Sequence, residues 1–307
     1  MPETAPQPSS AAAEWAPAWG NDAAAHELSG PAPQPEGLLD VAAKRGTGAA
    51  ATKAPSRVVE VGAARIRVRD DAEAARATEI VTELRDGFQV DVSSPASLEA
   101  IQRRYSFFPS ELVAKLHARD LEFRELVAVH AALGHFAPIL GEARAGSSRA
   151  DTPQEVSSVG GVNAGMTFDP MNGVAPHIDS GAMGEYFKGP PGNFAMYGSG
   201  LNAKFDFGDN AKQLEGTATH ELAHGLMRYA LDRFMAATGY WADKNTPNGT
   251  AGLEAPVTKY GRTNADEDLS EAVMYFFVDR DTLHRKCPIR ERFLEQEVAA
   301  WTQKPNS

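Results

Sequence analysis

Cysteine is almost missing from this sequence: Cys287 is the only one among 307 residues. A single cysteine excludes an internal disulfide framework and a cysteine-rich zinc site, and it is typical of a protein made in a reducing compartment. Long hydrophobic runs are also lacking. Runs such as AVMYFFV at 272–278 are far shorter than the roughly 20 residues that a membrane-spanning helix requires. No membrane partner is therefore expected.

Basic residues are in deficit, with 30 lysines and arginines against 41 acidic residues and a net charge of -11. This balance excludes a protein whose main task is to grip nucleic acid or anionic lipid. The N-terminal letters MPETAPQPSS have no cationic start followed by an apolar stretch, so a Sec signal peptide is not indicated. We expect a cytoplasmic location at synthesis, and secretion or delivery by a route other than Sec stays open.

The composition changes near residue 57. Residues 1–56 are rich in Ala, Pro, Gly and Ser and hold few large aliphatic side chains, so we expect a disordered leader. It is either a flexible tail or a segment recognised by a secretion or injection apparatus. Residues 57–307 are expected to form one domain, with an N-terminal αβ and helical part at 57–140 and a catalytic core at 141–307.

Hydrophobic periodicity predicts the elements of the N-terminal part. Strand-like sequence at 57–69, a helical pattern at 71–84 and strand-like sequence at 87–92 together predict a βαβ unit. Helices are predicted over 94–105 and 109–140. The histidines in this last stretch have no acidic neighbours at ligand spacing, and we interpret them as ordinary surface or core residues: His117, His130 and His135.

The segment GTATHELAHGLM, residues 216–227, lies in a helix predicted over 214–237. His220 and His224 are one helical turn apart on the same side, so both imidazoles can bind one metal ion. Glu221 points about 100° away, which suits a base acting on a metal-bound water better than a third ligand. The alternative is an amphipathic helix carrying two solvated histidines, and a third ligand would decide between them.

A candidate for the third ligand lies in NADEDLSEAVMYFF, residues 264–277. Glu267 and Glu271 are one turn apart on the same face of a predicted helix. The acids at 266–268 could merely satisfy the positive end of this helix. That explanation does not account for Glu271, which borders the apolar run and needs a partner. The non-ligating nitrogen of a metal-bound histidine is a natural one.

The combination of HExxH with a later ExxxE resembles the gluzincin type of zincin metallopeptidase, and EDLSEAVMYFF at 267–277 is especially similar to the glutamate helix of lethal-factor-like metallopeptidase toxins. The resemblance covers about 193–294. It departs from the family at Leu269 and Ser270, which replace the usual phenylalanine and alanine. The resemblance implies an α+β fold: a zincin-like catalytic domain with a small twisted sheet, an active-site helix and a following glutamate helix.

The resemblance also implies a role for each site residue. Zn²⁺ would be the cofactor, and the roles are these: His220, His224 and Glu267 as zinc ligands, Glu221 as general base, Tyr260 as the donor that stabilises the oxyanion, and Glu271 as the carboxylate behind a histidine ligand. By analogy with zincins, the predicted strand NFAMY at 193–197 is the sheet edge that pairs with an extended substrate. The expected partner is a protein or peptide substrate.

A competing resemblance is weaker. GAMGEY at 181–186 is similar to the Gly-Ala-Met-Glu-Asn strand of zinc aminopeptidases. Gly184 stands where the amine-binding glutamate of those enzymes would be, and their third ligand lies about half as far downstream. We therefore expect an endopeptidase, a hydrolase that acts either as a secreted or injected toxin or effector, or as an intracellular housekeeping or regulatory metallopeptidase. A zinc-binding protein without catalysis is the least favoured alternative.

Overall fold

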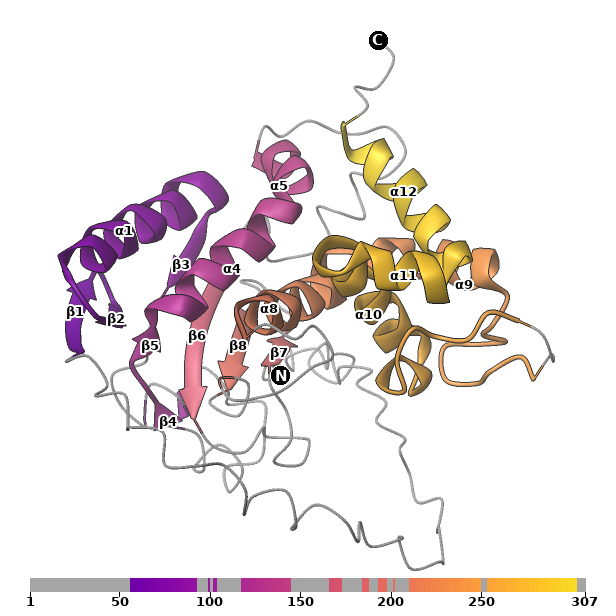
Figure 1. Cartoon of the computed structure of the whole chain (residues 1–307), viewed down its shortest axis with the longest axis horizontal. Helices are drawn as coiled ribbons and strands as arrows, with labels where there is room; N and C mark the ends of the chain where they lie inside the picture. Colours follow the sequence, from indigo (N-terminus) through magenta and orange to yellow (C-terminus); the bar gives the residue numbers. More distant parts are fainter. Residues whose placement is uncertain are drawn as a thin grey trace, which may run out of the picture. The chain divides into compact units, whose positions relative to one another are not determined.

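The computed structural model describes residues 56–92, 99, 102–103, 117–144, 166–172, 184–187, 193–197, 201, 210–249 and 253–302. The predicted leader lies outside these ranges except for residue 56, and so does most of the helix predicted over 94–105. The described chain mixes helices with two small sheets, in agreement with the expected α+β class (Figure 1). None of its helices is both long enough and apolar enough to cross a membrane.

The strand-like sequence at 57–69 forms a hairpin of two strands, β1 (Arg57–Val61) and β2 (Ala64–Val68), which pair antiparallel. The tight turn between them uses Gly62 with a positive φ of 59°, which glycine adopts without steric cost. Helix α1 (Asp71–Thr82) follows as predicted, because the Asp70 side chain accepts a hydrogen bond from the backbone N–H of Glu73 and caps its first turn.

The predicted βαβ unit is wrong. Strand β3 (Val90–Val92) does not join β1 and β2; it pairs parallel with β6 (Met166–Asn172) in a different sheet. Between α1 and β3 the chain passes through a π-helical segment, η2 (Glu83–Gly87), and Gln89 takes a positive φ of 55°. This change of direction carries β3 away from the hairpin.

The prediction of a single helix over 109–140 is also wrong, because the first residues of this stretch that the structure describes are not helical. Residues 117–122 form two short strands, β4 (His117–Ala118) and β5 (Leu121–Glu122), which pair with β6 and β2. Helix α4 (Phe123–His135) begins only after them. The Glu125 side chain accepts a hydrogen bond from the backbone N–H of Glu122 at 2.9 Å, which favours a helix start at this point.

The larger sheet has the order β3-β6-β8-β7, and β4 also pairs with β6. Strand β8 (Asn193–Tyr197) has the predicted bounds and is parallel to β6, whereas β7 (Gly184–Phe187) is antiparallel to β8. The expectation that β8 is an edge strand is wrong, because β6 and β7 occupy its two sides. Among the described strands, β7 ends the sheet on that side.

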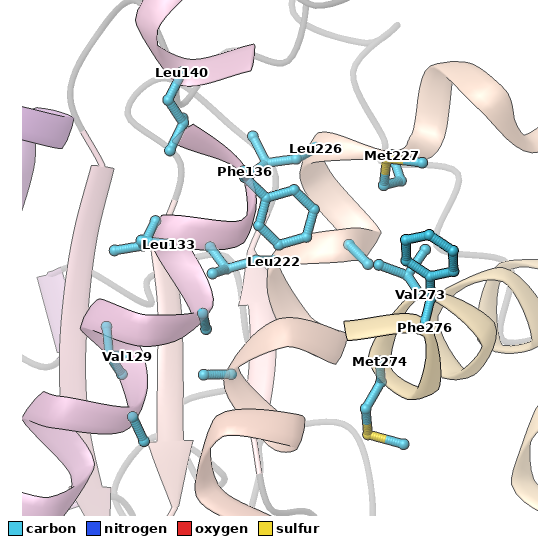
Figure 2. Close-up of a cluster of buried hydrophobic side chains, with 14 of the residues drawn as sticks. Val129, Leu133, Phe136, Leu140, Leu222, Leu226, Met227, Val273, Met274 and Phe276 are labelled. Carbon is cyan, nitrogen blue, oxygen red and sulfur yellow. The ribbon is translucent and has the colours of Figure 1, made fainter. Parts of the chain in front are cut away.

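Three helices pack together beside the larger sheet: α4, α8 (Asn210–Leu226) and α10 (Ala265–Val278). Helix α8 contacts α4 and α10 as well as β7 and β8. Figure 2 shows the buried side chains of this cluster: Val129 and Leu133 from α4, Phe136 between α4 and α5 (Ala137–Arg144), Leu140 from α5, Leu222 and Leu226 from α8, Met227 directly after α8, and Val273, Met274 and Phe276 from α10. Burial of these side chains fixes α8 between its two neighbours.

The helix predicted over 214–237 is interrupted. Helix α8 ends at Leu226, a 3₁₀ turn η4 (Arg228–Ala230) follows, and α9 (Leu231–Thr238) completes the segment. Gly225, a residue type of low helix propensity, lies just before the interruption. The remaining elements are the 3₁₀ turn η5 (Tyr260–Arg262), α11 (Arg280–Lys286) and α12 (Pro288–Thr302), and α12 packs against α9 and α10.

Candidate metal centre

Helix α8 supplies the two histidines of the motif. Leu222 and Leu226 are fully buried on the packed face of α8, which sets the rotation of the helix. His220 and His224 therefore lie side by side one turn apart, with 3.1 Å between their Nε2 atoms. At this distance one ring nitrogen can donate a hydrogen bond to the other, or both lone pairs can face one cation.

Helix α10 brings Glu267 to the same point. Its N-cap residue is Asn264, whose side chain accepts a hydrogen bond from the backbone N–H of Glu267 at 3.0 Å, and this places Glu267 in the first turn. Oε2 of Glu267 lies 3.1 Å from Nε2 of His220 and 3.3 Å from Nε2 of His224. The structure thus brings together three residues, of which His220 and Glu267 are 47 positions apart in the sequence.

The separations among these three atoms fit a bound metal ion. In a tetrahedral zinc site with bonds of about 2.0–2.1 Å, ligand atoms are about 3.3–3.4 Å apart. The observed edges of 3.1, 3.1 and 3.3 Å are close to that value. The cluster of His220, His224 and Glu267 can therefore hold a metal ion. The distances leave the identity of the metal open.

The charges of the clustered residues shift one another's pKa values. Burial disfavours a protonated imidazole, but contacts with Glu267 and Glu271 outweigh it and raise the pKa of His220 well above its ordinary value. Burial also disfavours an ionised Glu267, yet His224 and His220 lower the pKa of this carboxyl. Without metal, positive charge on His220 thus compensates the carboxylates. A cation that binds in its place must displace a proton.

A second layer of contacts lies behind the histidines, and α10 supplies it. Nδ1 of His220 is 3.0 Å from Oε1 of Glu271, an ion-pair distance at an angle outside that of a hydrogen bond. The other carboxylate oxygen of Glu271 accepts a hydrogen bond from the Thr258 hydroxyl at 2.6 Å. Glu271 therefore lies behind His220, as expected for a carboxylate that partners the second ring nitrogen of a histidine in the cluster. Nδ1 of His224 lies 3.1 Å from Oγ of Ser270.

Glu221 is buried beside the ligands, with 8% of its surface exposed. Burial raises the pKa of this carboxyl; the two neighbouring histidines oppose the shift, and the charges of Glu267 and Glu271 add to it. A carboxyl whose pKa is shifted toward neutrality binds a proton more readily than an ordinary glutamate does. This environment is suited to a general base.

Tyr260 lies beside His220, in η5. Its ring centroid is 5.9 Å from that of His220, and the residue is 54% exposed. Loss of hydration around the hydroxyl raises the pKa of Tyr260, and the charges of Glu267 and Glu221 raise it further. The phenol therefore stays protonated and able to donate a hydrogen bond at neutral pH.

The turn that carries Tyr260 packs closely on α10. A Cβ atom at Gly261 would come within 3.3 Å of Cβ of Pro256 and 3.4 Å of Cα of Asp268, so this position favours glycine. The backbone N–H of Gly261 donates to the Thr258 hydroxyl at 3.0 Å. Thr258 thus connects the turn to Glu271.

A buried polar network, which no local sequence pattern indicates, fixes α10 beneath the site. Asp268 accepts hydrogen bonds from Arg290 Nη2 at 2.6 Å, from Arg290 Nε at 2.8 Å and from the Trp241 indole at 2.8 Å. Arg290 also donates to the side chain and the carbonyl of Glu254. The predicted alternative, in which the acids at 266–268 serve only the helix dipole, does not describe these contacts. Asp266 pairs with Lys244.

The other histidines of the sequence analysis stay away from the cluster. His130 pairs with Glu83 at 2.7 Å, and His135 pairs with Glu215 at 2.8 Å while stacking on Phe277. Their acidic partners come from distant parts of the chain, which explains why spacing within 109–140 did not reveal them. His117 lies exposed in β4.

Comparisons with known proteins do not place the chain in a family. No protein-family model matches it, and no curated protein gives a significant match.

Proposed function

We propose that this protein is a zinc-dependent endopeptidase of the gluzincin type. The observation that carries the proposal is the triangle formed by Nε2 of His220, Nε2 of His224 and Oε2 of Glu267, with Glu221 buried next to it. The packing of α8 against β7, β8 and α10 agrees with the zincin-like arrangement that the sequence resemblance implies. A protein that only stored zinc would have no use for Glu221.

Zinc is the metal that this donor set favours. Two imidazole nitrogens and one carboxylate oxygen are typical of catalytic zinc sites, which keep a further position open. When bound, the ion lowers the pKa of a water molecule and polarises the carbonyl group of the scissile bond.

Glu221 moves the proton. Its carboxylate, next to but outside the ligand triangle, accepts a proton from the attacking water and returns it to the nitrogen of the departing amine. The raised pKa of Glu221 supports this role, because burial brings the pKa of the carboxyl closer to neutral pH.

Tyr260 stabilises the developing charge. Its exposed position beside His220 allows the hydroxyl to donate a hydrogen bond to the oxygen of the scissile carbonyl as that oxygen becomes negative. Loss of one such donor typically slows the chemical step by about 10²- to 10³-fold.

The substrate is an extended peptide that adds to the larger sheet. Strand β7, which ends the sheet on its side among the described strands and contacts α8, takes the role that the analogy first gave to β8. Main-chain hydrogen bonds along β7 would align the peptide with the metal centre. The resemblance to lethal-factor-like toxins extends the proposal to a secreted or injected effector. Residues 1–56 would then be the segment that a secretion or injection apparatus recognises.

The test compares the protein with one altered only at the base. Purified wild-type protein is expected to contain one zinc ion and to cleave peptides in an unbiased cleavage-site profile. Glu221→Gln should keep the zinc and lose activity by about 10²- to 10⁴-fold. Glu215→Gln is the matched control, since Glu215 lies on the same helix but pairs with His135.

Two results would contradict the proposal separately. Wild-type protein without zinc would show that the ligands are misassigned. Zinc-loaded wild-type protein with no cleavage, or a Glu221→Gln variant as active as Glu215→Gln, would show that the site binds metal but does not hydrolyse peptides in the proposed way.

A further inference from the structure

The Nδ1 atoms of the two histidines each contact one of two adjacent residues of α10. Glu271 lies behind His220, and Ser270 lies behind His224 with 3.1 Å between Oγ and Nδ1. Ser270 is 1% exposed, so its hydroxyl has little access to solvent. One histidine thus has an anionic partner and the other a neutral one.

A neutral hydroxyl such as that of Ser270 is sufficient to hold the proton of His224 on Nδ1. A neutral imidazole carries its proton on one nitrogen, so Nε2 can offer a lone pair to a metal only when Nδ1 holds the proton. A buried N–H without an acceptor is costly. The Ser270 oxygen can accept this hydrogen bond, whereas alanine, the usual residue here in the toxins that the helix resembles, has no acceptor.

We propose that Ser270 is a positioning residue of the metal centre: its hydroxyl accepts a hydrogen bond from Nδ1–H of His224 and thereby sets the tautomer and ring angle with which Nε2 faces the metal. The proposal rests on the metal-binding part of the proposed function and does not depend on peptide hydrolysis. It assigns a specific role to a residue at which this sequence departs from the family pattern.

The chain offers a matched control for the loss of a buried hydroxyl. Thr219 is fully buried on α8, directly before His220, and its Oγ1 has no hydrogen-bond partner among the described residues. Thr219→Val therefore removes a hydroxyl close to the centre without removing a hydrogen bond. Ser270→Thr is the conservative variant, because it keeps an acceptor oxygen at the proposed position.

The first measurement is zinc affinity of the full chain, obtained by titration against a competing chelator. Ser270→Ala should bind zinc about 10-fold more weakly, at the lower end of the range for lost partners of metal-bound histidines, because the lost acceptor is neutral. Ser270→Thr should recover most of the affinity, and Thr219→Val should equal wild type. Equal affinities of Ser270→Ala and Thr219→Val would overturn the proposal.

The second measurement reads the imidazole directly. Long-range ¹H–¹⁵N spectra of the histidine rings should show His224 protonated at Nδ1 in the metal-free wild-type protein, and mixed tautomers in metal-free Ser270→Ala. If Ser270→Ala does not fold, the wild-type spectrum still decides, since a metal-free wild-type protein in which neutral His224 carries its proton mainly on Nε2 overturns the proposal. Failure of the wild type to bind zinc would instead contradict the proposed function.

Discussion

The surface of residues 56–92 and the buried contact between α10 and α12 hold arginines in different environments. In residues 56–92, arginines such as Arg65 and Arg76 lie at the surface with about half of their side chains exposed, and they pair with acids across or along exposed faces. Arg290, in α12, has 0% side-chain exposure and pairs with Asp268, which is equally buried. The comparison separates ion pairs at the surface from a buried ion pair that holds α10, the helix that carries Glu267.

The difference follows from solvation. An exposed pair gains little because water already screens and solvates both charges. A buried charge is costly alone, so every donor of Arg290 needs an acceptor, and Asp268 together with Glu254 provides them. Burial raises the pKa of Asp268, and the bonds from Arg290 and Trp241 oppose that shift. The buried network therefore restricts where α10 can lie.

The largest expected effect comes from breaking this network. Arg290→Met keeps much of the volume but leaves Asp268 buried without its cation, which should cost about 3–5 kcal/mol in the free energy of unfolding. Chemical denaturation measures it, with Arg76→Met as the exposed counterpart, expected to change stability by less than about 0.5 kcal/mol. Similar losses in both variants would remove the distinction between the two environments.

A smaller effect is expected at the metal centre itself. Glu271→Gln keeps the shape and the contact with Thr258 but removes the negative charge beside Nδ1 of His220, so zinc affinity should fall about 10- to 100-fold. Chelator competition measures this change, with Glu215→Gln as the control. If both variants bind zinc equally well, Glu271 only occupies the helix interior.

The smallest expected effect is a pH dependence at α12, where Glu291 is buried but its partners are exposed. Burial raises its pKa, and the bonds from Arg280 at 2.9 Å and His284 at 2.6 Å outweigh this, so the pKa of Glu291 is lowered from 4.5. A lowered pKa in the folded state stabilises the fold above pH 4.5 and loses that contribution as the pH falls through the lowered value.

The measurement for Glu291 is urea denaturation of wild type and Glu291→Gln from neutral to acidic pH. Wild type should be the more stable at neutral pH, and the difference should shrink below pH 4.5. A difference that stays constant with pH would show that packing, and not charge, accounts for the contribution of this side chain.

Local signals in the sequence predicted some elements well. Helix α1 lies within the stretch 71–84 that the sequence predicted as helical, α10 begins within the predicted stretch 264–277, and β8 has the predicted bounds. The HExxH spacing and the one-turn separation of Glu267 and Glu271 led to the cluster because both depend only on helical geometry.

Long-range pairing was not predictable in the same way. The two-residue strands β4 and β5 lie within a sequence of helical periodicity, and their strand state depends on β6 and β2. Arg290 meets Asp268 across 22 positions without any local pattern. Ser270 was visible only as a departure from the family, because nothing in the spacing shows that its hydroxyl faces Nδ1 of His224.

Thr258 joins two parts of the candidate active site through one atom. Its Oγ1 donates to Glu271 behind His220 and accepts the N–H of Gly261 beside Tyr260. Because a β-branched side chain has few allowed rotamers, a single torsion angle sets both contacts. The orientation of His220 and the position of Tyr260 are therefore coupled, so that disorder in the turn at 258–262 would be transmitted to the imidazole of His220.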